Sequence, residues 1–392
     1  MEPDADARSS GGEAGEVMAE RWQDVAAVIG ALDSAAVAAA RARQARLTKP
    51  AGSLGQLEDL AVQLAGVQGR AVPRLAERAI VVMAADHGVA AEGVSAYPPV
   101  VTAQMVANFL AGGAAINVLA RQTGARLVVV DVGVASALPS GDDGEASPVA
   151  APRAGSAGSD STFRRVPIAR GTANLARGPA MSRAQAEAAI GVGLEVVGAE
   201  AARGLDAVVL GDMGIGNTTA GAALVAALCA QPPAAVVGRG TGVDDAGWRR
   251  KVGVVERALA VNHPDLADPL GALAALGGFE HAGLVGVALG AAARRAVVVV
   301  DGLAATAAAL VAARLCPAVR AYLVAGHASV EPGQRAALAA LDLRPLLDLD
   351  LRLGEGTGGA LALHLLDAAV RLHAEMATFD AAGVSEREPF PS

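Results

Sequence analysis

The sequence predicts an α/β protein with a doubly wound, Rossmann-like parallel sheet and a smaller helical lobe. Continuous rather than alternating apolar runs are typical of strands covered on both faces, as in a parallel sheet. Each run ends in Asp, Gly or both and leads to Ala-rich helical sequence, which favours right-handed βαβ crossovers. The chain of 392 residues is 53% hydrophobic, which is enough to bury a large core.

The N-terminal region is expected to be helical after a disordered start. Residues 1–18 are polar or small without periodicity and predict a disordered tail. The Ala-rich pattern over 21–44 predicts a helix, and 48–55 predicts a loop. Ser53 is well placed to cap the next helix, which is predicted over about 54–64.

Five apolar runs predict the strands of a large domain, residues 71–330. Ligands of such sheets bind beyond the carboxyl ends of the strands, where polar residues cluster here. The stretch 136–162 is rich in Gly, Ser, Pro and Asp and predicts a flexible surface loop. The C-terminal part is helical with a Gly-rich break at 354–359, so residues 19–70 and 331–380 are assigned to the small helical lobe. The five runs are 79–85, 126–130, 207–210, 296–300 and 321–325.

Composition narrows the classes of function. There are 32 basic and 40 acidic residues, giving a formal net charge of −8, so no basic face for nucleic acid is expected. Cys229 and Cys316 are too few for a disulfide scaffold or a Cys-rich metal site. No run of about 18 consecutive apolar residues and no basic signal peptide is present, so no membrane segment is expected. These features predict a soluble, cytoplasmic enzyme.

A glycine-rich segment, 210–221, follows one predicted strand and opens a helix. Its glycines would let the backbone approach an anion, and the helix N-terminus favours phosphate. Neither the Walker pattern nor the G-x-G-x-x-G spacing is present, which disfavours a P-loop and a dinucleotide site. The alternative is a tight turn in which Asn217 or Thr218 only caps the helix.

Two further glycine-rich loops precede predicted helices. The loop 238–245 leads to Lys251, one of two lysines in the chain. By itself this lysine is better explained by a solvated helix face, and the alternative is a role that an ammonium serves better than a guanidinium. The loop 353–360 places Glu355 at a helix start. Burial there would raise its pKa toward that of a general base, and the alternative is an acid that stabilises the helix dipole.

The remaining polar residues give no sign of a metal or a nucleophile. The six histidines lack the spacing of a zinc site, and no G-x-S-x-G elbow occurs, so neither a metal nor a cofactor is expected. His87 and His327 are expected to be hydrogen-bonded residues at strand ends. Tyr97, in a polar loop, could offer a stacking surface for a ring.

Ten sequence blocks, taken together, resemble the nicotinate-nucleotide–dimethylbenzimidazole phosphoribosyltransferase family of cobalamin biosynthesis. They extend from about residue 45 to 375 in family order, which is far more specific than any single loop. The blocks are KPAGSLG (49–55), DHGV (86–89), SAYP (95–98) with TAQM (102–105), GGAAIN (112–117), GTAN (171–174), GPAM (178–181), GIGNTT (214–219), GRGTG (238–242), GGFE (277–280) and LGEGTG (353–358).

The resemblance implies transfer of the phosphoribosyl group of nicotinate mononucleotide to 5,6-dimethylbenzimidazole. The products are nicotinate and α-ribazole 5′-phosphate, with inversion at the anomeric carbon. Glu355 matches the family's general base, which accepts the N–H proton of the benzimidazole. The pyridinium nitrogen leaves neutral, so the reaction requires no general acid, metal or cofactor. The resemblance also implies a homodimer with the active site near the subunit interface.

The resemblance also implies which residues bind substrate. The loops 214–219 and 238–242 would hold the phosphate, with Lys251 near the phosphoribosyl end. A polar lip around Tyr97 would line the base pocket. Asp212 stands where the family has Glu, so its carboxylate reaches one methylene less far. The implied substrate-binding residues are Ser95, Tyr97, Pro98, Gln104, Asp212, Gly214, Gly216, Asn217, Thr218, Gly238, Gly240, Thr241, Gly242 and Lys251.

Three alternatives fit parts of the sequence. The same fold could use another acceptor, such as adenine or a different benzimidazole, because an apolar pocket rejects one missing methyl by only ~1–3 kcal/mol. A non-catalytic nucleotide or ribazole sensor would have no need of Glu355. An NAD-linked oxidoreductase is disfavoured by the missing dinucleotide fingerprint. The sequence leaves the identity of the acceptor open.

Overall fold

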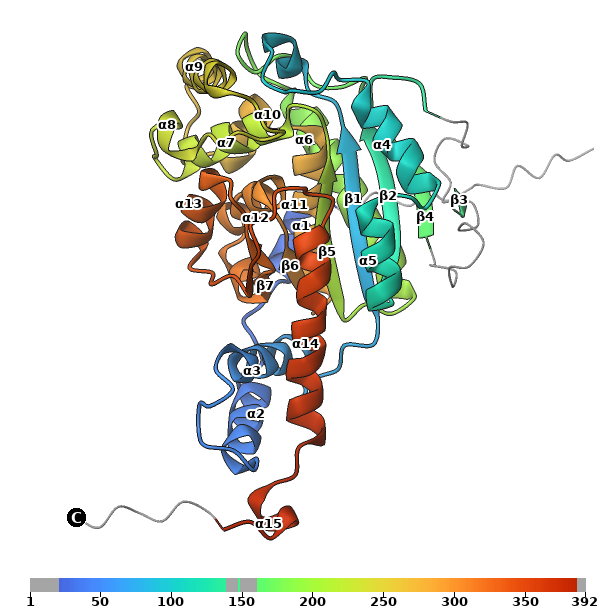
Figure 1. Ribbon diagram of the computed structural model, residues 1–392, viewed down its shortest axis with the longest axis vertical. Coiled ribbons are helices and arrows are strands. Elements are labelled where there is room, and N and C mark those ends of the chain that lie inside the picture. Colours follow the sequence, from blue (N-terminus) through green and yellow to red (C-terminus); the bar gives the residue numbers. More distant parts are fainter. Residues whose placement is uncertain (1–20, 139–146, 149–160, 386–392) are drawn as a thin grey trace, which may run out of the picture.

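A mainly parallel sheet occupies the centre of the molecule (Figure 1), and the computed structural model describes residues 21–138, 147–148 and 161–385. The strand order is β3-β4-β2-β1-β5-β6-β7, in which only β3 is antiparallel. All five predicted strands are present, which confirms the predicted α/β fold. The strands are β1 (Arg78–Ala85), β2 (Arg126–Gly133), β3 (Ser147–Pro148), β4 (Ser161–Arg165), β5 (Ala207–Met213), β6 (Val297–Val300) and β7 (Leu323–Ala325).

Helices cover both faces of this sheet, which explains why its central strands are apolar throughout. In Figure 1, α4 (Val101–Leu110), α5 (Ala115–Thr123) and α14 (Thr357–Glu375) lie in front of the strands. On the other face, α11 (Phe279–Ala293) packs against four strands and α12 (Leu303–Leu315) packs beside it.

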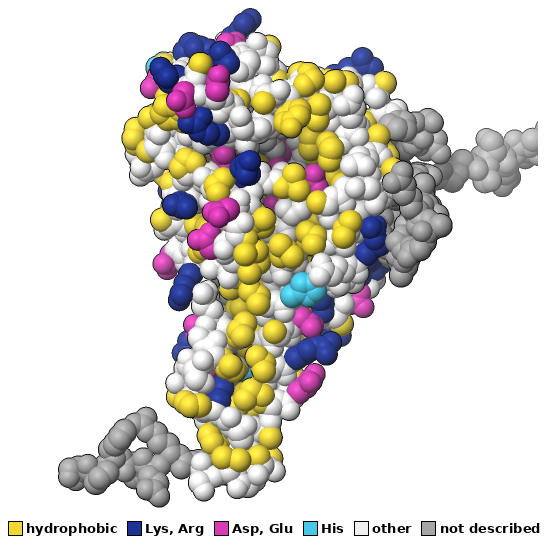
Figure 2. All heavy atoms as spheres, in the orientation of Figure 1, with side chains coloured by type: hydrophobic (Ala, Val, Ile, Leu, Met, Phe, Trp, Pro, Cys, Tyr) yellow, Lys and Arg dark blue, Asp and Glu magenta, His cyan; other side chains and the backbone are white. Residues whose placement is uncertain are grey.

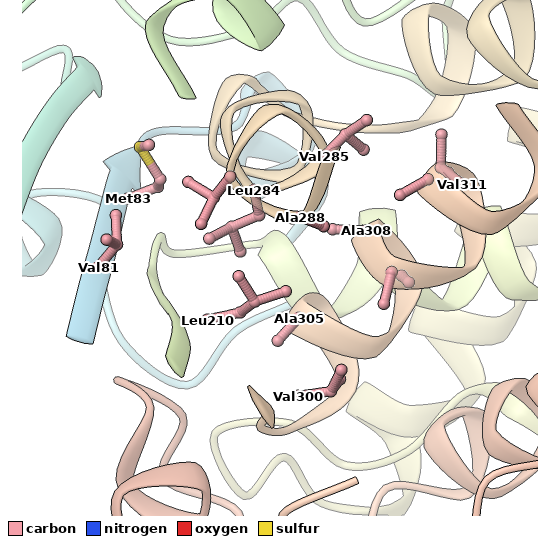
Figure 3. Close-up of a cluster of buried hydrophobic side chains, with 14 of the residues drawn as sticks. Val81, Met83, Leu210, Leu284, Val285, Ala288, Val300, Ala305, Ala308 and Val311 are labelled. Atoms are coloured by element: carbon pink, nitrogen blue, oxygen red, sulfur yellow. The ribbon is translucent and has the colours of Figure 1, made fainter. Parts of the chain in front are cut away.

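The packing of α11 and α12 on the sheet forms the largest part of the core (Figure 3). Met83 and Leu210 project from β1 and β5 toward Leu284 and Ala288 of α11, with Ala305 of α12 beside them. All five side chains are buried. Burial of these side chains withdraws apolar surface from water, which stabilises the fold by about 25 cal/mol per Å². The need to cover both faces of the strands explains why their apolar runs are continuous in the sequence.

The strand order places a topological switch point between β1 and β5. From β1 the chain continues to β2 on one side, whereas β5, β6 and β7 follow one another on the other side. Crossovers leave the sheet in opposite directions there, which opens a crevice at the carboxyl ends of the strands. Asp86 and His87 follow β1 directly, and Asp212 is the penultimate residue of β5. The fold therefore brings these polar residues to the edge that the sequence predicted for the site.

The N-terminal helices differ in detail from the prediction. The helix predicted over 21–44 is two helices, α1 (Trp22–Ala27) and α2 (Ser34–Arg46), and the Asp33 side chain caps the second. The expected cap at Ser53 is wrong, because α3 (Gln56–Gln68) begins after Gly55, whose φ of +55° ends the preceding turn.

The helices α2 and α3 pack on each other, and α3 packs on α14. In Figure 1 these two helices and the lower half of α14 extend below the sheet. We propose that they form the small helical lobe assigned to residues 19–70 and 331–380. The assigned range 331–380 also contains α13 (Pro332–Leu341), which packs against α12 beside the sheet rather than on α2 or α3.

The expected loop 136–162 ends two residues too late. Ser161 and Thr162 are the start of β4, which pairs in parallel with β2. This strand lacks a continuous apolar run because it lies near the edge of the sheet and only alternate residues are buried. The rest of that loop, apart from 136–138 and β3, lies outside the described residues, as does the expected tail 1–18.

The segment Val101–Thr123 is long and apolar enough in composition to cross a membrane. In the structure it is two helices, α4 and α5, of 10 and 9 residues, separated by a turn. A membrane-spanning helix needs about 20 residues, so neither helix is long enough on its own.

Further elements complete the described chain. They are η1 (Gly88–Glu92), α6 (Arg183–Ala202), α7 (Asn217–Leu228), α8 (Pro233–Val236), α9 (Asp245–Asn262), α10 (Pro269–Leu276), η2 (Pro317–Tyr322), β8 (His327–Ala328), β9 (Leu347–Asp348) and α15 (Phe379–Ala382).

The helices α6 and α11 cross with their backbones in contact. A Cβ added at Gly193 would lie 2.0 Å from the carbonyl oxygen of Gly283, and one at Gly286 would lie 2.0 Å from that of Ile190. Backbone atoms cannot move aside as a flexible side chain could. Glycine is therefore required at this crossing, which fixes α11 against the rest of the core.

We expect Gly193→Ala to destabilise the protein by at least about 2 kcal/mol, because the added methyl overlaps backbone. Gly191, two residues earlier in α6, has nothing within 4 Å of an added Cβ. Gly191→Ala should therefore stabilise the protein by up to about 1 kcal/mol through helix propensity. Chemical denaturation of both variants measures the difference, and equal effects would contradict the proposed backbone contact.

Candidate active site

A cleft of about 120 Å³ lies where β5 and β6 end. Its walls come from the loop after β5, the loop 240–241, the start of α12, the segment after β7 and the residues before α14. A wider cleft of about 770 Å³ adjoins it and shares Glu331 and Arg352 with it. A third cleft, of about 640 Å³ between α3, η2 and β7, is lined by none of the predicted site residues.

Glu355 lies in a turn of three consecutive residues with positive φ. The φ values are +81° at Gly354, +62° at Glu355 and +88° at Gly356, directly before α14. The Glu355 N–H donates to the carbonyl oxygen of Asp212 at 3.2 Å, which ties the turn to the end of β5. The left-handed region is unfavourable for a residue with a Cβ. Glycine occupies the two flanking positions, where a positive φ costs little, so Glu355 is the one residue of this turn that is held in the left-handed region despite its Cβ.

The Glu355 carboxylate is buried at the N-terminus of α5. Glu355 is not among the residues that line the cleft, although the preceding Gly354 is. Oε2 accepts the Ile116 N–H at 3.4 Å, and Glu355 is only 4% exposed. Burial raises the pKa of Glu355, the Ile116 N–H partly opposes this, and the charge of Asp301 raises the pKa further. A carboxylate with a raised pKa is suited to accept a proton near neutral pH.

Asp212 faces the cleft from the end of β5. Its Oδ2 accepts a hydrogen bond from the Asn217 amide at 2.7 Å. Burial, reinforced by the charges of Asp301, Glu280 and Glu355, raises the pKa of Asp212 to about 8. The structure thus brings the predicted residues Asp212, Asn217 and Glu355 together, with Asp212 largely protonated at neutral pH.

Lys251 projects from α9 toward the N-terminus of α7 and is completely buried. Its ammonium donates to the Thr218 hydroxyl at 2.9 Å. A Cβ at Gly240 would lie 2.8 Å from both the Lys251 nitrogen and the Thr218 oxygen. Burial lowers the pKa of Lys251, and the Glu331 carboxylate opposes that shift. The two glycine-rich loops therefore meet at Lys251, which is not a solvated lysine.

Glu331 is a site residue that sequence analysis missed. Its Oε1 accepts the Gly240 N–H at 2.7 Å, and a Cβ at Gly238 would collide with its carboxylate. Its Oε2 is buried without a hydrogen-bond partner among the described residues. One amide of the predicted phosphate loop is thus already occupied by a carboxylate.

The predicted base-binding lip is only partly assembled. The Thr241 hydroxyl accepts the Ala96 N–H at 2.9 Å and lies 3.1 Å from the Ser95 hydroxyl, which joins two loops. The side chains of Tyr97, Pro98 and Gln104 are exposed. In the described part of the chain, no hydrogen bond connects these three side chains to Glu355 or Asp212.

The other predicted glycines shape the loops. A Cβ at Gly214 would lie 2.4 Å from the carbonyl oxygen of Ala85, so only glycine allows this approach to β1. Gly216, at φ +102°, precedes the first residue of α7, and Gly242 has φ +98°. These positions require glycine for backbone reasons, whether or not an anion binds.

His87, Glu280 and His281 form a buried triad behind the cleft. His87 Nε2 and His281 Nδ1 each lie 2.6 Å from Oε1 of Glu280. Despite burial, the two histidines hold the pKa of Glu280 well below its usual range. Donors bound to one zinc ion at about 2.0–2.1 Å stand more than about 3 Å apart in a tetrahedron, so this spacing is that of a paired carboxylate. The prediction that His87 is hydrogen-bonded is confirmed.

His327 is the second histidine expected at a strand end, and it lies 3.3 Å from Oδ1 of Asp301. The contact with Asp301 raises the pKa of His327 despite an opposing effect of burial. Asp301 follows the β6 run directly and was visible in the sequence as a strand-end acid. Glu280 stands in the GGFE block, whereas no sequence pattern indicated that Glu331 would reach the 238–242 loop.

We expect Asp212→Asn to raise thermal stability increasingly with pH. The pKa of about 8 in the folded protein exceeds the ordinary value of 3.8, so Asp212 contributes stability at low pH that is lost as pH rises through 8. Asn keeps the oxygen that accepts from Asn217 and does not ionise. Scanning calorimetry should show Tm at least about 2 °C above wild type at about pH 9 and a smaller difference at about pH 5. A difference independent of pH would contradict the raised pKa.

Known proteins resemble this chain over almost its whole length. A family model described as phosphoribosyltransferase matches residues 29–384. A nicotinate-nucleotide–dimethylbenzimidazole phosphoribosyltransferase of Roseiflexus sp. (strain RS-1) is 54% identical over 357 residues, covering 91% of this chain and 96% of the relative. A protein of the same name from Salinispora tropica is 51% identical over 363 residues, covering 92% of this chain and 98% of the relative.

Solved structures agree in fold. The crystal structure of the Thermus thermophilus protein of that name superimposes with a TM-score of 0.81 at 48% identity, covering 91% of this chain and 100% of the other. Both family and fold match what the sequence blocks predicted. The chain belongs to the nicotinate-nucleotide–dimethylbenzimidazole phosphoribosyltransferase family.

Proposed function

We propose that this protein transfers the phosphoribosyl group of nicotinate mononucleotide to 5,6-dimethylbenzimidazole, forming α-ribazole 5′-phosphate and nicotinate. The names of relatives that match over more than nine tenths of the chain support this reaction. The observation that carries the proposal is the buried Glu355 carboxylate, placed by a glycine turn at the switch point of the sheet. A protein that only bound ligand would have no need of a buried base there.

Glu355 acts as the general base. Its carboxylate accepts the N–H proton of the benzimidazole while the other ring nitrogen forms a bond to the anomeric carbon of the ribose. The bond between that carbon and the nicotinate nitrogen breaks, and its electron pair neutralises the pyridinium. Attack opposite the leaving group inverts the anomeric centre. Base assistance of this kind contributes ~10²–10⁴-fold to the rate.

The phosphate binds where the loops 214–219 and 238–242 meet at Lys251. The first amides of α7 and the buried ammonium both attract an anion. The contact of Lys251 with Thr218 supports this placement, because it positions the ammonium beside both loops. The Glu331 carboxylate already accepts the Gly240 N–H. Because a carboxylate repels a phosphate and accepts a hydroxyl proton, Glu331 would bind a ribose hydroxyl rather than a phosphate oxygen.

Ser95, Tyr97, Pro98 and Gln104 form the base pocket in this proposal. Ser95 and Thr241 supply the described link between that lip and the phosphate loop. Tyr97 offers its ring face to the benzimidazole. Protonated Asp212 would then be a hydrogen-bond donor toward the substrates rather than a second base.

We further propose that the protein works as a homodimer in the cytoplasm. Leu361, Leu365, Ala368 and Leu372 are half-exposed at spacings of four, three and four residues, so they share one face of α14. Figure 2 shows hydrophobic side chains gathered along this helix.

The proposed cytoplasmic location is supported by the cysteines. Cys229 and Cys316 are both free thiols, which suits a reducing compartment.

The reaction is tested with nicotinate mononucleotide and 5,6-dimethylbenzimidazole, followed by chromatography. Glu355→Gln should slow formation of α-ribazole phosphate by at least ~10²-fold, because the amide cannot accept the proton. Glu375→Gln is a matched control at the far, exposed end of the same helix and should keep wild-type turnover. Nucleotide binding without product in the wild type would sink the proposal for this acceptor and favour another base or a sensor.

The dimer is tested by light scattering of Leu365→Asp. A charge in the apolar face should convert a wild-type dimer into a monomer, since buried unpaired charges are costly. Ala374→Asp, the control, places the same charge on an exposed position of α14 outside that face. A monomeric wild type, or a dimer that survives Leu365→Asp, would refute this interface.

A further inference from the structure

Asp301 follows β6 directly, and its carboxylate is directed at the helix that Glu355 precedes. The side chain is completely buried and does not line the cleft. Oδ2 accepts the Gly356 N–H at 3.1 Å, and Oδ1 accepts the Gly359 N–H at 3.0 Å. One carboxylate thus binds two backbone amides at the start of α14.

These amides need an acceptor from outside the helix. The first N–H groups of any helix lack partners within the helix, and a side chain at the N-cap normally supplies one. Here the N-cap residue is Gly356, which has no side chain. Asp301 therefore caps α14 from a different element, 55 residues earlier in the chain.

The bond to Gly356 also acts on the conformation of Glu355. The Gly356 N–H belongs to the peptide group that follows Glu355, so its direction is linked to the ψ angle of Glu355. That residue is held at a φ of +62°, which persists only where surrounding contacts impose it. Asp301 provides such a contact from the end of a strand of the central sheet.

Asp301 is itself held by two residues, by His327 at Oδ1 and by Gln334 at its carbonyl oxygen. The Gln334 amide donates to the carbonyl oxygens of Asp301 at 2.6 Å and His327 at 3.0 Å, which joins the two segments. The His327 ring packs so closely on α14 that a Cβ at Gly358 would lie 2.0 Å from it. The acceptor that fixes the turn is therefore part of the rigid core.

The charge of Asp301 also acts on its neighbours. It raises the pKa of Glu355 and that of Asp212. Four groups from other elements act on Asp301, Glu355 or each other. They are Asp212 on β5, His327 on β8, which contacts Asp301, Glu280 on α11, which acts on Asp212, and the Ile116 N–H on α5, which acts on Glu355. Among the described residues, no lysine or arginine opposes this rise in the pKa of Glu355.

We propose that Asp301 is a positioning residue for Glu355. Asp301 caps α14 from the end of β6 and thereby fixes the turn 354–356, which presents the base. This inference rests on the proposed function of Glu355. Asp301 acts through the backbone and through its charge, and it does not contact the substrates.

The test is Asp301→Asn, measured by pH-dependent kinetics and by hydrogen exchange of the peptide that spans 353–360. Asn has one acceptor oxygen for two amides and no charge. We expect kcat to fall ~10–10²-fold, because small displacements of a catalytic group are costly, with both KM values changed much less. The acidic limb of the kcat profile should move to lower pH, because the pKa of Glu355 falls without the neighbouring negative charge. Exchange at Gly356 and Gly359 should become faster.

Asp301→Glu separates charge from position. It retains the negative charge but displaces the acceptor, so kcat should fall while the acidic limb stays at its wild-type pH. Asp206→Asn is a matched control. Asp206 is a buried Asp that accepts the N–H groups of Ala76 and Glu77 at the opposite, amino edge of the sheet. It should leave kcat and exchange at 353–360 as in wild type.

Three outcomes would overturn the inference. They are an unchanged kcat in Asp301→Asn, a loss of kcat with no movement of the acidic limb, and unchanged exchange at 353–360. Absence of product with the wild type would instead refute the proposed function, and the exchange measurement would still decide whether Asp301 fixes the turn. If Asp301→Asn does not fold, the kinetics and exchange of Asp301→Glu decide the question.

Discussion

The burial of negative charge at the carboxyl edge of a parallel sheet is the constraint on which the site depends. Asp212, Glu280, Asp301 and Glu355 are all nearly inaccessible to water, and a buried charge is costly unless it is paired or hydrogen-bonded. Within the described ranges, none of these four acids forms an ion pair with Lys or Arg. Instead, helix-start amides serve Asp301 and Glu355, an Asn amide serves Asp212, and two histidines serve Glu280. The glycine turns follow from this, since they let backbone N–H groups reach the acids.

This arrangement divides the site into two electrostatic halves. On the side of α5 and α14, the charge of Asp301 favours the protonated forms of Asp212 and Glu355, so a proton can be received there. On the side of α7 and α9, the buried Lys251 and two glycine-rich loops favour an anion, with Glu331 as the acid that limits the positive potential. The cleft lies between these halves, so a nucleotide would place its phosphate and its reacting carbon in different electrostatic surroundings.

Much of this was predictable because the strands of the sheet are apolar throughout and their polar residues stand at one end. That pattern located β1, β2, β5, β6 and β7 and therefore the edge that carries Asp212 and Asp301. The apolar pattern missed β4, because a position near the edge of the sheet leaves alternate residues of this strand unburied. The separate prediction of a cap at Ser53 failed because the positive φ of Gly55 determines where α3 begins. Glu355 was singled out by its glycine-rich loop and Lys251 by the scarcity of lysine in the chain, and the family resemblance implied their roles. Glu331 was not, because its contact with Gly240 joins segments 91 residues apart and leaves no local pattern.

The helix α14 links regions of the protein that lie far apart in the sequence. It is 19 residues long, about 28 Å, with the Glu355 turn at one end. At the other end, the Arg43 and Gln44 side chains of α2 contact the backbone and ring of His373. This one helix therefore joins the N-terminal helices to the turn that carries Glu355. The apolar face of the proposed dimer lies on the same helix, so association of two subunits would bury the element whose first turn follows Glu355.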